Sequence, residues 1–240
     1  MKPALRRRSE IQYRKSLLAI ANQIGEIVNG IYDGSQASAD KTASTLVDYS
    51  DVISDWAEMV GRKMFVQVER EEWSQWRAVS EELAAGLRDV VGSTPVGMVA
   101  QDIVYRQIQL MKSLPLEAAD RVMDIQQRAM EAVVNGERPE QLYDMIMQSG
   151  GVTASRAQLI ARTEIGRATG ALTQARALSV GSEGYWWRIE GVGTRPSHRK
   201  MKDVFVRWDN PPTLDGMTGH AGCLPNCKCW SEVQIPEPRK

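Results

Sequence analysis

The sequence predicts an α+β protein that is mostly α: long N-terminal helices, in a hairpin or bundle, precede a C-terminal domain of one long helix and a small β unit. Apolar side chains recur every three or four residues in the first part, and no proline occurs between Pro3 and Pro95. After Gly184 the composition changes, because this end holds six of the ten prolines and four of the seven tryptophans. Helix interiors exclude proline and strands favour aromatic residues, so the two regions differ in fold.

The helical region is expected over residues 1–150. Its first helix is expected over residues 4–32, where an apolar stripe follows the period of an α-helix. The stripe consists of Leu17, Ile20, Ile24, Ile27 and Ile31. A second helical stretch is expected over residues 38–91, with a kink or break at Gly61, and residues 92–95 end it. Two long helices joined by a turn predict an antiparallel hairpin or part of a bundle.

Shorter helices are expected over residues 96–113, 116–135 and 139–147. Pro115 and Pro139 stand where helix starts carry proline, because the first turn does not need the N–H group that proline lacks. None of these segments contains an evident catalytic constellation.

The C-terminal domain is expected over residues 151–240. A helix that ends near Val180 holds Gly166 and Gly170, one turn apart. Each glycine inside a helix costs about 1 kcal/mol relative to alanine, so we expect another backbone to pack closely against them.

Two strands are expected after this helix, at residues 185–189 and 204–208, where aromatic and β-branched residues gather. Long loops rich in glycine and proline separate and follow them. Such a small β unit buries little core by itself, and a bound metal would help to hold it together.

The chain has no net charge, but its charges are unevenly distributed. Residues 1–15 carry six basic residues against one acidic residue, residues 16–183 carry 15 against 23, and residues 184–240 carry nine against six. The basic N-terminal stretch is expected to contact DNA or an acidic protein surface, with plain solvation as the alternative. Its candidate contact residues are Arg6, Arg7, Arg8, Arg14 and Lys15.

Neither a membrane span nor a secretory signal is expected. No segment approaches the ~20 continuous apolar residues of a membrane helix, and no apolar run follows the basic N-terminus. Three cysteines within seven positions do not make a disulfide framework, so we expect a reduced, cytosolic setting and a metal or core role for them.

Both histidines and all three cysteines of the chain lie close together near its C-terminal end. The candidate metal ligands are His198, His220, Cys223, Cys227 and Cys229. Thiolates and imidazoles at close spacing favour Zn²⁺ with four tetrahedral ligands, so a structural zinc ion bound by four of these five is expected. Two alternatives stay open: reduced cysteines without a metal, and an open catalytic metal, for which no convincing general base is present.

Four sequence blocks follow one another in the C-terminal domain. They read R-A-Q-L-I-A-R-T-E at residues 156–164, W-R-I at residues 187–189, R-P-S-H-R at residues 195–199 and N-C-K-C at residues 226–229. In their order and spacing they resemble the phage Mu F-like minor head proteins, the phage head morphogenesis family of tailed bacteriophages.

The resemblance implies a structural virion protein without enzymatic activity, present in a few copies at the portal and the inner side of the capsid. It implies a role in head assembly and in DNA packaging or ejection. The implied partners are the portal protein, other capsid or scaffold proteins and packaged DNA, and the implied place of assembly is the host cytoplasm. Some family members carry fused toxin domains, and none is expected here because the chain ends shortly after the cysteines.

Three residues of the predicted long helix match the family's most recognisable triplet: Arg162, Thr163 and Glu164. The resemblance implies that they tie this helix to the β unit through buried polar bonds, since an arginine and a carboxylate form directional pairs. Two other functions fit the residues alone. One is a zinc-containing nucleic-acid-binding module, which the small basic excess of residues 184–240 supports only slightly, and the other is a metal-dependent hydrolase.

Overall fold

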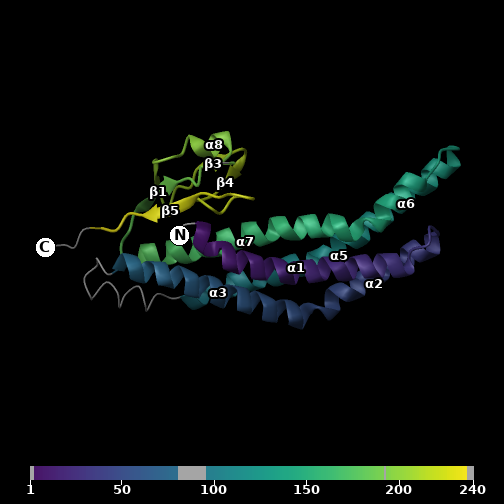
Figure 1. Cartoon of the computed structure of the whole chain (residues 1–240), viewed down its shortest axis with the longest axis horizontal. Helices are drawn as coiled ribbons and strands as arrows, with labels where there is room; N and C mark the ends of the chain where they lie inside the picture. Colours follow the sequence, from purple (N-terminus) through teal and green to yellow (C-terminus); the bar gives the residue numbers. More distant parts are fainter. Residues whose placement is uncertain (1–2, 81–95, 192, 237–240) are drawn as a thin grey trace. The chain divides into compact units, whose positions relative to one another are not determined.

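The chain is mostly helical, with small antiparallel sheets towards its C-terminal end, as the sequence predicts (Figure 1). The computed structural model describes residues 3–80, 96–191 and 193–236, without the side chains of residues 3–6, 78–80 and 96–98. The helices are α1 (Pro3–Ile31), α2 (Gln36–Val52), α3 (Ser54–Ser80), α5 (Val96–Val134), α6 (Glu140–Met147), α7 (Ser149–Ser179) and α8 (Pro196–Arg199). The strands are β1 (Gly184–Arg188), β2 (Phe205–Arg207), β3 (Thr213–Leu214), β4 (Met217–Thr218) and β5 (Trp230–Val233).

The chain divides into two compact units that are not consecutive in sequence. The first, here the helical unit, consists of Tyr13–Gly61 and Tyr105–Ile160. The second, here the mixed unit, consists of Met1–Gln12, Arg62–Val104 and Ala161–Lys240. Helices α1, α3, α5 and α7 contribute residues to both units. The expected boundary at residue 150, between a helical region and a C-terminal domain, stays a prediction.

One face of α1 forms much of the core of the helical unit. The larger side chains buried on this face are Tyr13, Leu17, Ile20, Ile24 and Val28. The predicted stripe agrees as far as Ile24 and then differs, because Val28 is buried whereas Ile27 and Ile31 are only half-buried. Eleven residues make about three helical turns, so Val28 returns to the side of Leu17 and Ile27 does not.

Two buried hydrogen bonds join α1 and the segment after it to α5. The hydroxyl of Tyr13 donates to Gln107 Oε1 and that of Tyr32 donates to Gln126 Oε1, both over 2.7 Å. Burial raises the pKa of Tyr32 to about 12, so its hydroxyl keeps the proton that it donates. Buried polar groups are stable only when they are paired, and these pairs fix which faces of the helices meet.

Helix α5 runs unbroken through Pro115, so the prediction that this proline starts a new helix was wrong. Proline in a helix interior removes one backbone hydrogen bond and crowds the preceding turn. Here Met111, Leu114 and Ala118 are buried on both sides of it. Packing of these side chains holds the segment helical despite the local cost.

The break in the second helical stretch lies at Ile53, the C-cap residue between α2 and α3, and not at Gly61, which lies inside α3. The N–H of Ile53 still bonds to the carbonyl of Tyr49, so the chain bends without losing that bond. The parts of this prediction at residues 81–91 and 92–95 lie outside the described residues.

Helices α1 and α7 cross closely in the helical unit, at a pair of glycines. A Cβ atom added to Gly150 would lie 2.9 Å from the Cα of Gly25 and 3.3 Å from the carbonyl oxygen of Ala21. Both contacts are with backbone atoms, which cannot rotate away. The neighbouring Gly151, also in α7, has nothing within 4 Å of such an atom.

We therefore expect Gly150→Ala to destabilise the protein by about 1–3 kcal/mol, the usual cost of overpacking. The matched control Gly151→Ala should be neutral or stabilising by up to about 1 kcal/mol, because alanine is the better helix former. Thermal unfolding followed by circular dichroism measures both. Equal midpoints for the two variants would contradict the close crossing.

The mixed unit contains a three-stranded antiparallel sheet in the order β2-β1-β5, with Trp186 paired to Phe205 on one side and to Glu232 on the other. The sequence predicts β1 and β2 but not β5. The inward-facing side chains of the sheet, Tyr185, Trp187 and Val206, are buried in one cluster with residues of α3 and α7. A second, two-stranded sheet pairs β3 with β4.

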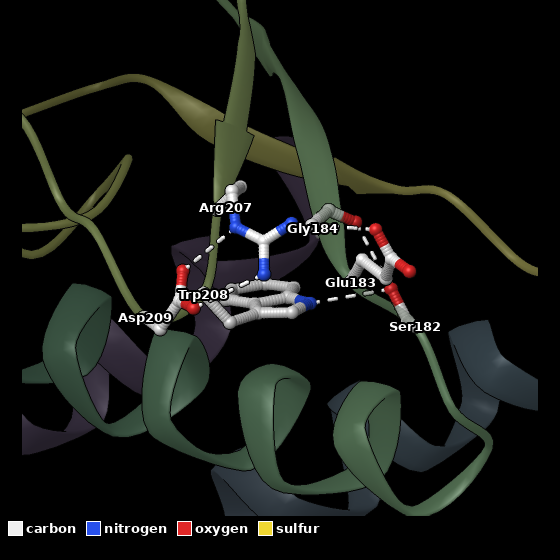
Figure 2. Close-up of polar contacts among 6 residues, drawn as sticks. All are labelled: Ser182, Glu183, Gly184, Arg207, Trp208 and Asp209. Carbon is white, nitrogen blue, oxygen red and sulfur yellow. Dashed lines mark hydrogen bonds and ion pairs between the residues drawn. The ribbon is translucent and has the colours of Figure 1, made fainter.

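Polar contacts of Trp208 join the end of β2 to the chain between α7 and β1 (Figure 2). Its backbone N–H donates to the carbonyl of Glu183 over 3.1 Å and its indole N–H donates to Ser182 Oγ over 3.2 Å. The hydroxyl of Ser182 donates in turn to the carbonyl of Gly184 over 3.0 Å. Because Trp208 and Ser182 are buried, these bonds fix the start of β1 relative to β2.

Candidate metal centre

His198 lies on α8, a single turn that begins with Pro196. Proline suits this first position because its fixed φ matches the helix. The His198 side chain is buried and its ring lies edge-on to Trp187, with the ring centroids 5.8 Å apart. Its Nε2 has no hydrogen-bond partner among the described residues, so its polar contacts are on the Nδ1 side.

Nδ1 of His198 faces two cysteine sulfurs. It lies 3.3 Å from Sγ of Cys227 and 3.5 Å from Sγ of Cys229, and the three ligand atoms all lie within 4.8 Å of one another. Around a tetrahedral zinc with bonds of about 2.3 Å to sulfur and about 2.0 Å to nitrogen, neighbouring ligand atoms lie about 3.5 Å apart. The three side chains therefore fit a zinc ion, with Nδ1 as the ligating nitrogen of His198.

The contact between the two cysteine side chains shifts their pKa values in opposite directions. The hydrogen bond from Cys229 lowers the pKa of Cys227 to about 5, and the same contact, together with burial, raises the pKa of Cys229. The backbone N–H of Cys229 also points at Sγ of Cys227, over 3.4 Å. A lowered pKa favours the thiolate of Cys227, the form in which cysteine binds a metal.

The other predicted histidine, His220, has different partners. Its Nδ1 lies 3.2 Å from the hydroxyl of Tyr185, and its ring packs edge-on against Tyr185 and Trp208. Burial lowers the pKa of His220, which favours the neutral ring. The structure therefore places His220 outside the group formed by His198 and the two cysteines.

Cys223 also lies outside that group and is half-buried. Its sulfur lies against α7, where a Cβ atom on Gly170 would approach it to 2.6 Å. The expectation of a close backbone contact at Gly170 is corrected by this geometry, because the neighbour is a side-chain sulfur. Of the five predicted ligands, the structure brings together three.

The triplet on α7 reaches the loop that carries the cysteines. Arg162 Nη1 donates to Asn226 Oδ1 over 2.9 Å, and Thr163 Oγ1 accepts the backbone N–H of Asn226 over 3.1 Å. Glu164 is buried and pairs with Arg167 over 2.9 Å, and Arg167 Nε donates to the carbonyl of Cys223 over 2.9 Å. The sequence marks Asn226 only as the first residue of the N-C-K-C block, directly before Cys227, and gives no sign of its contacts with α7.

The basic residues of the N-terminal stretch lie along α1. Arg7, Arg8 and Lys15 are exposed and Arg14 is half-buried, whereas the side chain of Arg6 lies outside the described side chains. Arg7 and Arg8 belong to the mixed unit, and Arg14 and Lys15 belong to the helical unit. A role for them in binding DNA or an acidic surface stays a prediction.

Within residues 3–80, 96–191 and 193–236, no helix is both long and apolar enough to cross a membrane. No significant match was found among solved structures. A Haemophilus influenzae protein that is itself named only as an uncharacterized protein is 36% identical over 130 residues. The aligned stretch covers 54% of this chain but 27% of the relative, so the chain spans only a little over a quarter of that protein.

The remaining comparison concerns a protein family. Residues 123–232 match the family described as Phage Mu protein F like protein. The matched stretch begins in α5 and ends in β5, and it contains α7, the three-residue His/Cys group and Asn226. Residues 123–232 therefore form a Phage Mu protein F-like domain.

Proposed function

We propose that the protein is a structural minor head protein of a tailed bacteriophage that acts in head assembly, and in DNA packaging or ejection. The observation that carries the proposal is the match of residues 123–232 to the Phage Mu protein F like family. The proposed partners are the portal protein, other capsid or scaffold proteins and packaged DNA. The proposed location is the virion, at the portal vertex or capsid interior, and the host cytoplasm during assembly.

Within this function we propose a structural role for the metal centre. His198, Cys227 and Cys229 are each more than nine-tenths buried. A catalytic ion keeps an open position that substrate reaches, whereas a structural ion is enclosed by its ligands, so the burial supports the structural role. Of the five predicted ligands we propose that these three bind the zinc ion.

Heads purified from cells that produce the phage test the proposed function. Antibodies against the chain should label one vertex of each head, and deletion of its gene should yield heads that lack the protein and infect poorly. Three results would contradict the proposal. The first is that the protein never co-sediments with heads or portal. The second is that the protein is absent from heads and binds free DNA tightly in a salt-sensitive way. The third is a hydrolytic activity that a chelator abolishes.

A further inference from the structure

The loop that carries the cysteines makes a tight turn directly before Cys227. Asn226 has a φ of 54°, in the left-handed region. Among residues other than glycine, asparagine and aspartate adopt this conformation most readily. The N–H of Cys227 donates to the carbonyl of Leu224 over 3.0 Å and closes the turn. The conformation of Asn226 therefore decides the direction in which Cys227 leaves the turn.

Asn226 is also the residue of this turn that α7 holds by two hydrogen bonds. Its backbone N–H donates to Thr163 Oγ1 and its side-chain oxygen accepts from Arg162 Nη1, over 3.1 and 2.9 Å. Thr163 is buried, and Arg162 is oriented on its other side by Glu10 over 3.2 Å. Thr163 is thus enclosed by its surroundings, and Arg162 has a second polar contact besides Asn226.

Two neighbouring carbonyl groups of the loop are held by arginines as well. Arg167 Nε donates to the carbonyl of Cys223 over 2.9 Å, and Arg195 Nη2 donates to that of Pro225 over 3.3 Å. Arg195 directly precedes α8, the helix that carries His198. The loop is therefore attached both to α7 and to the segment that positions the ligating histidine.

We propose that Asn226 is the positioning residue of the metal centre, through which α7 sets the place of the Cys227 sulfur relative to His198. The proposal rests on the metal site proposed above. Bond lengths to zinc tolerate only about 0.2 Å of deviation, so a small displacement of this turn weakens binding. Residues that orient metal ligands in this way change metal affinity by about 10–100-fold when they are replaced.

The test uses the full chain and compares zinc affinity, by competition with a chromophoric chelator, across variants of Asn226. Asn226→Ala loses the side-chain bond and is strained at a positive φ, and we expect it to weaken zinc binding by about 10–100-fold. Asn226→Asp keeps both the conformation and an acceptor for Arg162, and we expect it to retain affinity within a few-fold. Thr163→Val removes the acceptor of the Asn226 N–H and should also weaken binding.

The absorption spectrum of the Co²⁺-substituted protein is the second readout, because ligand geometry changes its visible bands. We expect altered bands for Asn226→Ala and unaltered bands for Asn226→Asp and for the control Asn210→Ala, an exposed asparagine elsewhere in the mixed unit. Unchanged zinc affinity and an unchanged spectrum in Asn226→Ala, even with a lower melting temperature, would overturn the positioning role. Failure of the unaltered chain to bind zinc would instead overturn the metal site itself.

Discussion

Replacing Cys227 with serine is expected to abolish zinc binding and to destabilise the mixed unit by more than about 4 kcal/mol, the range reached when a protein loses a structural metal. The reason is geometric, because Cys227 supplies a buried thiolate 3.3 Å from Nδ1 of His198. Serine is a poor zinc ligand and leaves Cys229 and His198 facing a weaker partner. Tryptophan fluorescence during urea unfolding reports on this unit, which contains every tryptophan of the chain except Trp56.

Cys223→Ser is the matched control for this prediction. Its sulfur is half-buried and lies outside the group of three ligand atoms, so we expect zinc binding to persist and stability to change by about 1 kcal/mol. Equal losses in the two variants would contradict the three-residue site and would make Cys223 a full ligand.

Replacing Arg176 with methionine is expected to destabilise the protein by about 3–5 kcal/mol, because it leaves a buried carboxylate without its partner. Arg176 of α7 pairs with Glu72 and Glu69 of α3, and its guanidinium lies 5.0 Å from the ring centroid of Trp73. Arg176 and Glu72 are both almost fully buried, and burial lowers the pKa of Arg176. Urea unfolding of the full chain measures the loss.

Two further variants separate the buried charge from the packing. In Arg176→Met with Glu72→Gln the charge is gone, but the introduced glutamine keeps an oxygen for the N–H of Trp76, which donates to Glu72 Oε1 in the unaltered protein. This double variant should recover most of the lost stability.

The second variant tests an exposed ion pair. Arg207→Met removes the pairs of Arg207 with Asp209 and Glu183, visible in Figure 2, and should cost at most about 1 kcal/mol. A loss as large as that of Arg176→Met would contradict this account.

The helices were predictable from sequence to the extent that local periodicity decides them. The stripe of α1 is recognisable because its apolar residues repeat with the helical period. Helix α5 was not predictable as one element, since Pro115 is a local stop signal that only the packing of Met111 and Ala118 overrides. Strand β5 has no clear alternation of apolar and polar residues. It forms because β1 offers it a partner strand, in which Trp187 and Arg188 pair with Ser231 and Trp230.

The metal centre was predictable in its residue types but not in its membership. Spacing along the chain marks His220 and Cys223 as candidates equal to the others. Which residues meet depends on long-range contacts: Tyr185 engages His220, and Cys223 lies over Gly170. The hydrogen bonds from α7 to Asn226 are likewise tertiary contacts. Thr163 and Arg162 lie 63 and 64 positions from Asn226 in the sequence, so no local pattern predicts these bonds.

Zinc analysis of the purified full-length chain, combined with X-ray absorption at the zinc edge, tests the central claim most directly. We expect about one zinc per chain, with two sulfur ligands at about 2.3 Å and an imidazole nitrogen at about 2.0 Å. A cooperatively folded chain that contains no metal and takes up no added zinc would contradict the claim that His198, Cys227 and Cys229 form a metal centre.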